Sequence, residues 1–234
     1  MAEHKDIRVP LTVGSVSDLD TLRAVDSDDT PQFDILELRL DGLQQAEIEE
    51  AHRLSLRVQS WGVPILITMR DVSEGGIQQL STEEKEARLQ LFAEVASYVD
   101  VEIANYTYFK HTLEGMQSNG VKTVLSYHNF QQTPTTLREQ YERAVEFGAD
   151  IPKFALMHQS TADVHRCAEF IQSVELPISL MGMGALAPVS RLLYAQLGSV
   201  LNYGYLGATA TAPGQWSAAF LKQAIAQLEL IQKA

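Results

Sequence analysis

The sequence has a single cysteine, Cys167, so no disulfide can form within the chain and nothing indicates an oxidising compartment. No apolar run approaches the roughly 18 residues needed to cross a bilayer, and the opening stretch MAEHKDIRVP lacks the apolar core of a signal peptide. Basic residues are also few, because 18 Lys and Arg stand against 30 Asp and Glu, and a net charge of −12 argues against a nucleic-acid partner. These absences predict a soluble, cytoplasmic protein without a membrane or nucleic-acid partner.

The composition is that of an ordinary globular protein, since 45% of the 234 residues are hydrophobic and 21% are charged. Apolar runs of strand length alternate with segments of helical spacing along the chain. The candidate strands are Ile7–Val13, Ile35–Leu40, Pro64–Met69, Tyr98–Ile103, Val121–Tyr127, Ile151–Leu156, Ile178–Met181 and Val200–Tyr205.

Helix start and stop signals lie between these strands. The clearest predicted helices run from the capping box Ser81–Glu84 to about Tyr98, from a cap at Thr133-Pro134 to Phe147 with Gly148 as the stop, and from about Trp216 to Lys233. Repeated strand–helix alternation implies parallel strands joined by crossover helices. Eight such units predict an α/β fold of the closed (β/α)8 TIM barrel type, with residues 1–234 forming a single domain, rather than an open doubly wound sheet.

Polar residues gather toward the carboxyl ends of four candidate strands, where a barrel places its active site. Residues two apart in a strand share a face, and the shared-face sets are Glu37, Arg39 and Asp41, then Thr68 and Arg70, then Asp100 and Glu102, then Ser126 and His128. A core packed only for stability would not need these groups. The coincidence across four strands therefore indicates a functional site at this end.

Each set also has a simpler interpretation. Glu37 and Arg39 could form an ordinary ion pair, Asp100 and Glu102 could be exposed at a strand end, and Arg70 and Glu74 could be solvated at a loop start. Most histidines should lie on the surface, and we assign no role to the four in terminal or helical segments, His4, His52, His111 and His165.

His128 differs from the other histidines because it ends an apolar strand. His158 also follows a strand, but it has the opposite strand parity to Lys153, so we rank it below His128. The methionines Met181 and Met183 could simply fill the core. Cys167 is interpreted as a small buried helix residue and not as a nucleophile.

Lys153 interrupts the apolar strand DIPKFALM, although lysine is among the residues least often buried. Burial lowers the pKa of a lysine, and a nearby Arg39 or Arg70 would lower it further. The neutral amine that results can attack a ketone or aldehyde to form an imine. Compensation of the charge by Glu37 or Glu102 is the alternative that the residues leave open.

Seven segments together resemble the type I 3-dehydroquinate dehydratase family. They occur in order from the second strand to the last helix: ELRLDGL (37–43), TMRDVSEGG (68–76), VDVEIAN (99–105), SYHNF (126–130), IPKFALM (151–157), MGMGALAPVSR (181–191) and ATAPGQ (210–215). The first strand matches least well. Thr211 stands where the family pattern leads us to expect serine, and Tyr203 stands where it leads us to expect phenylalanine.

The resemblance implies a (β/α)8 barrel, commonly a homodimer, that uses no metal or organic cofactor. The implied enzyme is a carbon–oxygen hydro-lyase of the shikimate pathway, which supplies chorismate and the aromatic amino acids. It would convert the small-molecule substrate 3-dehydroquinate to 3-dehydroshikimate by syn elimination through a lysine Schiff base.

The resemblance also implies a role for individual residues. Lys153 would form the imine, His128 would be the general acid–base, and Glu74 would orient His128. The substrate-binding residues that it implies are Glu37, Arg39, Arg70, Arg191, Thr211, Gln215, Thr12 and Met183.

Two other interpretations remain open at the level of sequence. A class I aldolase also uses a barrel lysine, and Gly182, Gly184, Gly204 and Gly207 could belong to phosphate-binding loops after the last two strands. A non-catalytic barrel could instead hold a small anion through a few arginines at its mouth. Formation of product from 3-dehydroquinate, or recovery of the ligand unchanged, separates these interpretations.

Overall fold

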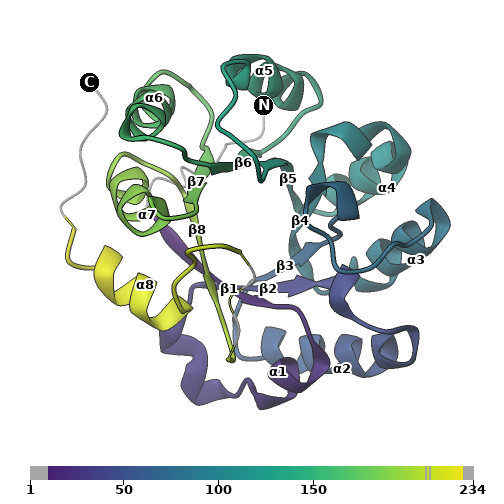
Figure 1. Cartoon of the computed structure of the whole chain (residues 1–234). Helices are drawn as coiled ribbons and strands as arrows, with labels where there is room; N and C mark the ends of the chain where they lie inside the picture. Colours follow the sequence, from purple (N-terminus) through teal and green to yellow (C-terminus); the bar gives the residue numbers. More distant parts are fainter. Residues whose placement is uncertain (1–9, 209, 211, 229–234) are drawn as a thin grey trace.

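Parallel strands form a ring at the centre of the molecule, and helices surround them (Figure 1). The computed structural model describes residues 10–208, 210 and 212–228. Within these residues the strands are β1 Leu11–Val16, β2 Ile35–Arg39, β3 Ile65–Thr68, β4 Ala96–Glu102, β5 Lys122–Asn129, β6 Ile151–Met157, β7 Ser179–Met183 and β8 Leu201–Tyr205.

The strands follow the order β7-β6-β5-β4-β3-β2-β1-β8, so β1 to β7 pair successively in sequence order and β1 also pairs with β8. A parallel bridge between Ile178 and Ser199, together with the hydrogen bond from Val200 N to Ile178 O, joins the two ends of the sheet. The ring is therefore nearly closed. This architecture confirms the predicted (β/α)8 barrel.

The connecting helices lie on the outside of the barrel, as expected for right-handed crossovers between parallel strands (Figure 1). The α-helices among the described residues are α1 Leu19–Ala24, α2 Ile48–Gln59, α3 Thr82–Phe92, α4 Tyr106–Ser118, α5 Leu137–Glu146, α6 Thr161–Gln172, α7 Ala187–Gln196 and α8 Ala218–Ile225. None of them is long and apolar enough to be a candidate membrane span.

Two apolar layers hold the barrel together. Alternate strand residues such as Leu36, Leu38 and Phe154 face outward and pack with buried helix residues in one large cluster. The inward-facing residues near the amino ends of the strands form a second cluster that includes Ile35 and Ile151. Farther along the same strands the inward positions become polar. The apolar layer below thus forms the base on which a polar site is built.

Several predicted boundaries were wrong, and local hydrogen bonding explains the differences. The first strand begins at Leu11 and runs to Val16, beyond the predicted end at Val13, because its pairing with β2 and β8 extends that far; residues 7–9 of the predicted strand lie outside the described residues. The capping box at Ser81 is confirmed, but α3 ends at Phe92 and not near Tyr98, since β4 already begins at Ala96.

The next two predicted helices were also too long. Helix α5 begins at Leu137, because the Thr133 hydroxyl donates to Met157 O instead of capping a helix. Helix α8 begins after the cap Ser217 and ends at Ile225, whereas Lys233, its predicted end, lies outside the described residues. Gly148 is confirmed as the stop of the segment before β6, with a left-handed φ of 79°.

We expect Phe154→Ala to lower the free energy of unfolding by about 3–5 kcal/mol, because it opens a cavity in the outer layer. Phe154 is fully buried, and its ring meets Phe170 edge-on with 6.2 Å between centroids. Urea unfolding followed by circular dichroism measures the change. Phe220→Ala is the matched control: Phe220 is 52% exposed, so its loss should cost less than about 1 kcal/mol. Equal losses for the two variants would contradict the described packing.

Candidate active site

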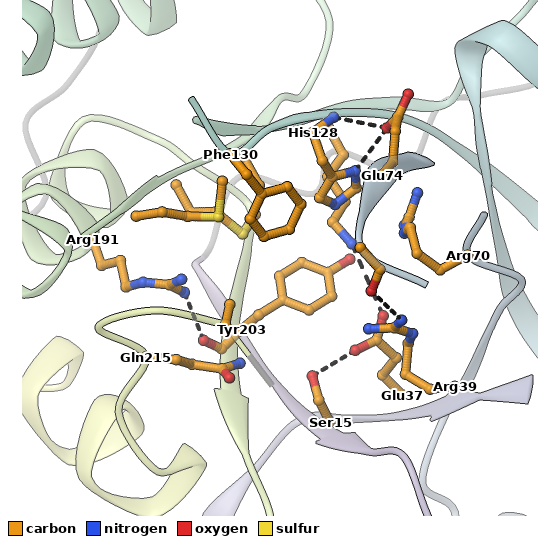
Figure 2. A pocket seen from close by; sticks show the side chains of 16 residues that line it. Ser15, Glu37, Arg39, Arg70, Glu74, His128, Phe130, Arg191, Tyr203 and Gln215 are labelled. Atoms are coloured by element: carbon orange, nitrogen blue, oxygen red, sulfur yellow. Dashed lines mark hydrogen bonds and ion pairs between the residues drawn. The ribbon is translucent and has the colours of Figure 1, made fainter. Parts of the chain in front are cut away.

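A cavity opens at the carboxyl ends of the strands, and side chains of β1, β2, β5, β6, β7 and β8 line it together with residues that follow the strands (Figure 2). The lining residues are Ser15, Glu37, Arg39, Arg70, Glu74, Gly75, His128, Phe130, Lys153, Ala155, Met181, Met183, Arg191, Tyr203, Ala212 and Gln215. The cavity thus brings together residues from three of the four predicted polar strand ends, Glu37 and Arg39, Arg70, and His128, with Lys153 of β6. It lies where a barrel of this type carries its active site.

The Lys153 amine is buried within this cavity beside two carboxylates. Nζ lies 2.7 Å from Asp100 Oδ2 and 3.9 Å from Glu37 Oε1, and the residue is only 3% exposed. The face of the Tyr203 ring lies 3.9 Å from the same nitrogen, which is cation–π distance. The charge is therefore compensated, but the predicted alternative partner Glu102 was wrong, and Asp100 takes its place.

Arg70 fixes the carboxylates on this side of the barrel. Its guanidinium donates to Asp100 at 2.8 Å, to Glu102 at 3.0 Å and to Ser126 Oγ at 2.7 Å. All four side chains are buried. The interpretation of Asp100, Glu102 and Arg70 as solvated strand-end residues was therefore wrong, because β4 begins early enough to point both carboxylates into the barrel.

The charges around Lys153 leave its pKa below the ordinary lysine value. Burial is the largest cause, and Arg70 adds to it through like-charge repulsion. Asp100 and Glu37 act in the opposite direction, because each favours the ammonium. The nitrogen is thus an ion-paired amine that loses its proton more easily than an exposed lysine, and it faces the cavity.

Glu37 is held by two hydroxyl groups. Ser15 Oγ donates to its Oε2 at 2.5 Å and Thr68 Oγ1 donates to its Oε1 at 2.7 Å. The neighbouring Arg39 is oriented by a two-pronged ion pair with Asp41, at 2.8 and 2.7 Å. Glu37 and Arg39 therefore do not form the simple pair with each other that their spacing permitted.

His128 and Glu74 meet at the rim of the cavity. His128 Nδ1 lies 3.1 Å from Glu74 Oε2, and the His128 backbone N–H donates to the same oxygen at 2.8 Å. Glu74 ends the 3-10 turn η4 (Val72–Glu74), which Asp71 caps and which Gly75 terminates with a left-handed φ of 88°. The loop geometry thus directs Glu74 at the imidazole, so neither side chain is free in solvent.

Burial moves both of these pKa values. It lowers the pKa of His128 well below its usual range, assisted by Arg70, Lys153 and Arg39. It raises the pKa of Glu74 to about 7, with Arg70 opposing the shift and Glu102 adding to it. Above pH 7 the pair therefore consists of a carboxylate and a neutral imidazole. Glu74 then favours the proton on Nδ1, which leaves Nε2 as a base.

Arg191 of α7 is a positively charged residue of the cavity that no described carboxylate neutralises. It is 3% exposed, its guanidinium donates to Tyr203 O at 2.8 Å, and its Nε has no hydrogen-bond partner within the described residues. Burial lowers the pKa of Arg191 to about 10. A buried guanidinium without a carboxylate partner in the described part of the chain indicates a place for an anionic ligand group.

The structure places the remaining predicted residues as follows. Gln215 and Met183 line the cavity, and Thr211 lies outside the described residues. Thr12 does not line the cavity: its side chain has the opposite strand parity, and Ser15 is the β1 residue that reaches Glu37. Ser15 and Phe130 were missed, although their positions at a strand end and just beyond one were available signals. Asp100 was noticed at its strand end but received no role.

His158 and Cys167 lie away from the cavity. His158 is buried between Thr133 Oγ1 and Tyr194 OH, each 2.8 Å from a ring nitrogen. Burial lowers the pKa of His158 to about 4, so the ring is neutral at physiological pH. Cys167 is a buried residue of α6, and burial raises its pKa to about 11. The interpretation of Cys167 as a buried helix residue is confirmed, and His158, which was ranked below His128, does not line the cavity.

Metal binding has no visible framework in the part of the chain that the structure describes, since no group of three or more His, Cys, Asp or Glu side chains could hold an ion. The polar groups of the cavity are arranged as ion pairs and hydrogen bonds around one amine, one imidazole and the Arg191 guanidinium, which has no carboxylate partner within the described residues. This arrangement suits covalent and acid–base chemistry on a small anionic molecule.

Comparison with curated proteins gives relatives named 3-dehydroquinate dehydratase. The sequence is 32% identical over 197 residues to the 3-dehydroquinate dehydratase of Methanothermobacter thermautotrophicus, a match that covers 83% of this chain and 85% of the relative. It is 34% identical over 198 residues to the 3-dehydroquinate dehydratase of Shigella flexneri serotype 5b, covering 79% of this chain and 78% of the relative.

Solved structures agree with these relatives. The crystal structure of 3-dehydroquinate dehydratase from Geobacillus kaustophilus superposes with a TM-score of 0.83 at 26% identity, over 93% of this chain and 90% of the other. The family model described as type I 3-dehydroquinase matches residues 7–232, almost the entire sequence. With this match and relatives above 30% identity, the chain belongs to the type I 3-dehydroquinase family.

Proposed function

We propose that this chain is a carbon–oxygen hydro-lyase that dehydrates 3-dehydroquinate to 3-dehydroshikimate in the shikimate pathway, through an imine on Lys153. Family membership and the names of its relatives support the reaction. The observation that carries the mechanism is the buried Lys153 amine, which faces a cavity shared with the His128–Glu74 pair and Arg191.

The first chemical step is attack of the Lys153 amine on the C3 ketone of the substrate. Only the neutral amine is nucleophilic, and the lowered pKa of Lys153 makes it easier to form than in an exposed lysine. Loss of water from the adduct gives an iminium. Its positive nitrogen draws electrons from the ring and acidifies the neighbouring C2 proton.

His128 then removes the C2 proton and returns a proton to the departing C1 hydroxyl. Its low pKa keeps it neutral and able to act as a base. Glu74 stabilises the positive charge that the imidazole gains in the first transfer, and it keeps the ring oriented through Nδ1. Both transfers on one face of the ring correspond to syn elimination.

The substrate's fixed groups match the rest of the cavity. Arg191 can bind the carboxylate through two parallel hydrogen bonds, because its charge is not neutralised by a described side chain. Glu37, Arg39 and Arg70 are available to the ring hydroxyls from the opposite side of the cavity (Figure 2). Gln215, Met183 and Thr211 are proposed to complete the site. Holding the ring at several points would bring the ketone to Lys153, which lowers the entropic part of the barrier.

A relative adds independent support for covalent chemistry. The crystal structure of type I 3-dehydroquinate dehydratase from Clostridium difficile, described as containing covalently modified comenic acid, superposes with a TM-score of 0.80 at 25% identity, over 93% of this chain and 91% of the other. A site of this architecture is thus associated with covalent ligand modification. The aldolase interpretation has no comparable support in this family.

We also propose that the whole chain works as one catalytic domain, that it forms a homodimer and that it acts in the cytoplasm. These proposals follow from the family resemblance and the composition of the chain. Light scattering at several protein concentrations tests the dimer, since a monomeric mass throughout would contradict it.

We expect sodium borohydride to inactivate the enzyme in the presence of 3-dehydroquinate and to add the reduced ligand's mass to Lys153. Borohydride reduces an imine to a stable amine, so peptide mass spectrometry locates the bond. Lys153→Ala should abolish both the adduct and turnover. Lys110→Ala is the matched control, because the Lys110 side chain is 52% exposed. An active enzyme without any adduct at Lys153 would disprove the imine mechanism.

We expect His128→Ala to lower kcat by about 10²–10⁴-fold, the usual contribution of a general acid–base, while an imine at Lys153 can still form. The ultraviolet absorbance of the conjugated enone product measures turnover, and borohydride trapping measures the imine. His111→Ala serves as the control, because the His111 side chain is 98% exposed. Wild-type kcat in His128→Ala would remove His128 from the proposed role.

We expect kcat/KM to rise with pH through about 7 as Glu74 loses its proton, since its carboxylate form favours the Nδ1–H tautomer of His128. Glu74→Gln should remove this ionisation and lower kcat by about tenfold or more. The pH profile of both enzymes measures the effect. If kcat/KM of Glu74→Gln still rises with pH near 7 as in the parent, the ionisation belongs to another group.

Stability provides a separate check on the same ionisation. The pKa of Glu74 is raised by folding from 4.5 to about 7, so the folded state binds more protons than the unfolded state between these values, and stability falls as pH rises. Glu74→Gln should therefore lose less stability than the parent between pH 5 and about 8. Thermal unfolding across this range measures the difference.

A further inference from the structure

Asp100 of β4 is fully buried against the nitrogen that is proposed to react, and its two oxygens have different partners. Oδ1 accepts hydrogen bonds from Arg70 at 2.8 Å and from Ser126 Oγ at 2.6 Å. Oδ2 accepts from Lys153 Nζ at 2.7 Å, and this is its only hydrogen bond within the described residues. One oxygen therefore fixes the carboxylate, and the other is reserved for the lysine.

The other two carboxylates nearby are committed elsewhere. Glu37 lies 3.9 Å from Nζ, beyond hydrogen-bond distance, and each of its oxygens accepts from a hydroxyl, Ser15 Oγ or Thr68 Oγ1. Glu102 accepts from Arg70, from the Asp71 backbone N–H and from Asn105. Among the described residues, Asp100 is thus the one carboxylate in hydrogen-bond contact with the Lys153 nitrogen.

The position of Asp100 follows from strand register and not from a flexible contact. Asp100 pairs with Thr68 of β3 and with Val124 of β5, while Ser126 pairs with Lys153 of β6. Ser126 also pairs with Glu102 of β4, two residues beyond Asp100, and its hydroxyl donates to Asp100. Three adjacent strands hold the carboxylate and the amine at a fixed separation.

Imine formation requires a base at this nitrogen. An ammonium that becomes an iminium loses two of its three protons, and both leave on the water made from the ketone oxygen. The nitrogen lone pair freed by the first proton forms the C–N bond, while the carbonyl π electrons move to oxygen. The nitrogen loses its positive charge when the ammonium gives up its first proton, and it is positive again in the iminium. A neighbouring carboxylate can therefore accept that proton and later stabilise the iminium charge.

We propose that Asp100 is a catalytic residue at the Lys153 nitrogen: its Oδ2 accepts a proton from the ammonium during attack on the ketone, and its carboxylate then stabilises the iminium. The inference rests on the proposed function of Lys153 and extends it. The accepted proton passes on to the departing water, so Asp100 is again a carboxylate beside the iminium and is regenerated in each cycle.

Other charged and titratable groups face the same amine and set the background for Asp100. By element they are Glu37 and Arg39 of β2, Arg70 following β3, Glu74 of η4, His128 of β5 and Tyr203 of β8. Burial would raise the pKa of Asp100, but Arg70 and Lys153 lower it by more, so it is ionised in the free enzyme. Asp100 in turn favours the protonated form of Lys153. Replacing Asp100 by Asn should therefore make Lys153 easier to deprotonate and less able to carry the iminium charge.

The test measures the Lys153 amine itself and turnover in the same variant. Cyanate reacts only with neutral amines, so carbamylation of Lys153, followed against pH by peptide mass spectrometry in the absence of substrate, titrates this nitrogen. We expect Asp100→Asn to move the midpoint of carbamylation to lower pH by about one unit and to lower kcat by about tenfold or more. A purely structural role for Asp100 would lower kcat without moving the midpoint.

Two further variants make the result specific. Glu102→Gln removes a buried carboxylate from the same Arg70 without touching Lys153, so it should move the midpoint by much less than Asp100→Asn. Asp100→Glu retains the negative charge but displaces the carboxylate, so we expect its carbamylation midpoint to stay near the parent's while its kcat falls. If Asp100→Asn does not fold, Asp100→Glu is the variant in which both quantities are measured. A midpoint unmoved in Asp100→Asn, or moved equally in Asp100→Glu or Glu102→Gln, overturns the proposal.

The failure of this inference can be distinguished from the failure of the proposed function. If the parent enzyme forms the borohydride-reduced adduct at Lys153 and Asp100→Asn has the parent's midpoint and kcat, the role of Asp100 is wrong while the imine mechanism stands. If the parent forms product but no adduct, the imine mechanism is wrong and the inference falls with it.

Discussion

A buried ammonium must be compensated, and the arrangement around Lys153 follows from that constraint. Desolvating a lysine is costly unless carboxylates and hydrogen bonds replace water. Here β2 and β4 supply Glu37 and Asp100, and Arg70 balances the excess negative charge that they and Glu102 create. Net compensation leaves the amine buried, oriented and able to lose its proton. The same network therefore provides both stability and reactivity.

The barrel makes this network possible because the carboxyl ends of its parallel strands converge. The inward positions change from apolar to polar along each strand, so residues distant in sequence meet at one level above a packed base. Glu74 and Arg191 enter from a loop and a helix that follow the strands, and they lie on opposite sides of the cavity (Figure 2). Acid–base and anion-binding groups are thereby separated across the space that a small ring would occupy.

Features determined by short-range chemistry could be predicted from the sequence, as with the capping box at Ser81 and the strand–helix alternation. The contact between Asp100 and Lys153 could not, because the residues are 53 positions apart and meet only through the register of three strands. Ser15 was missed because the first strand extends three residues beyond its predicted end, and Thr12, which the resemblance placed at the site, has the opposite strand parity to Ser15. Thr133 resembled a helix cap, but its hydroxyl is used by Met157 and His158, a tertiary contact that no local pattern reveals.

The central claim is that the substrate becomes covalently bonded to Lys153 during turnover, and the origin of the product's ketone oxygen tests it most directly. An imine expels the original oxygen, so hydrolysis must replace it with one from solvent. Turnover of 3-dehydroquinate in ¹⁸O-labelled water, corrected for exchange without enzyme, should give 3-dehydroshikimate labelled at the ketone in every cycle, as measured by rapid mass spectrometry. Product that retains the original ketone oxygen would contradict the account.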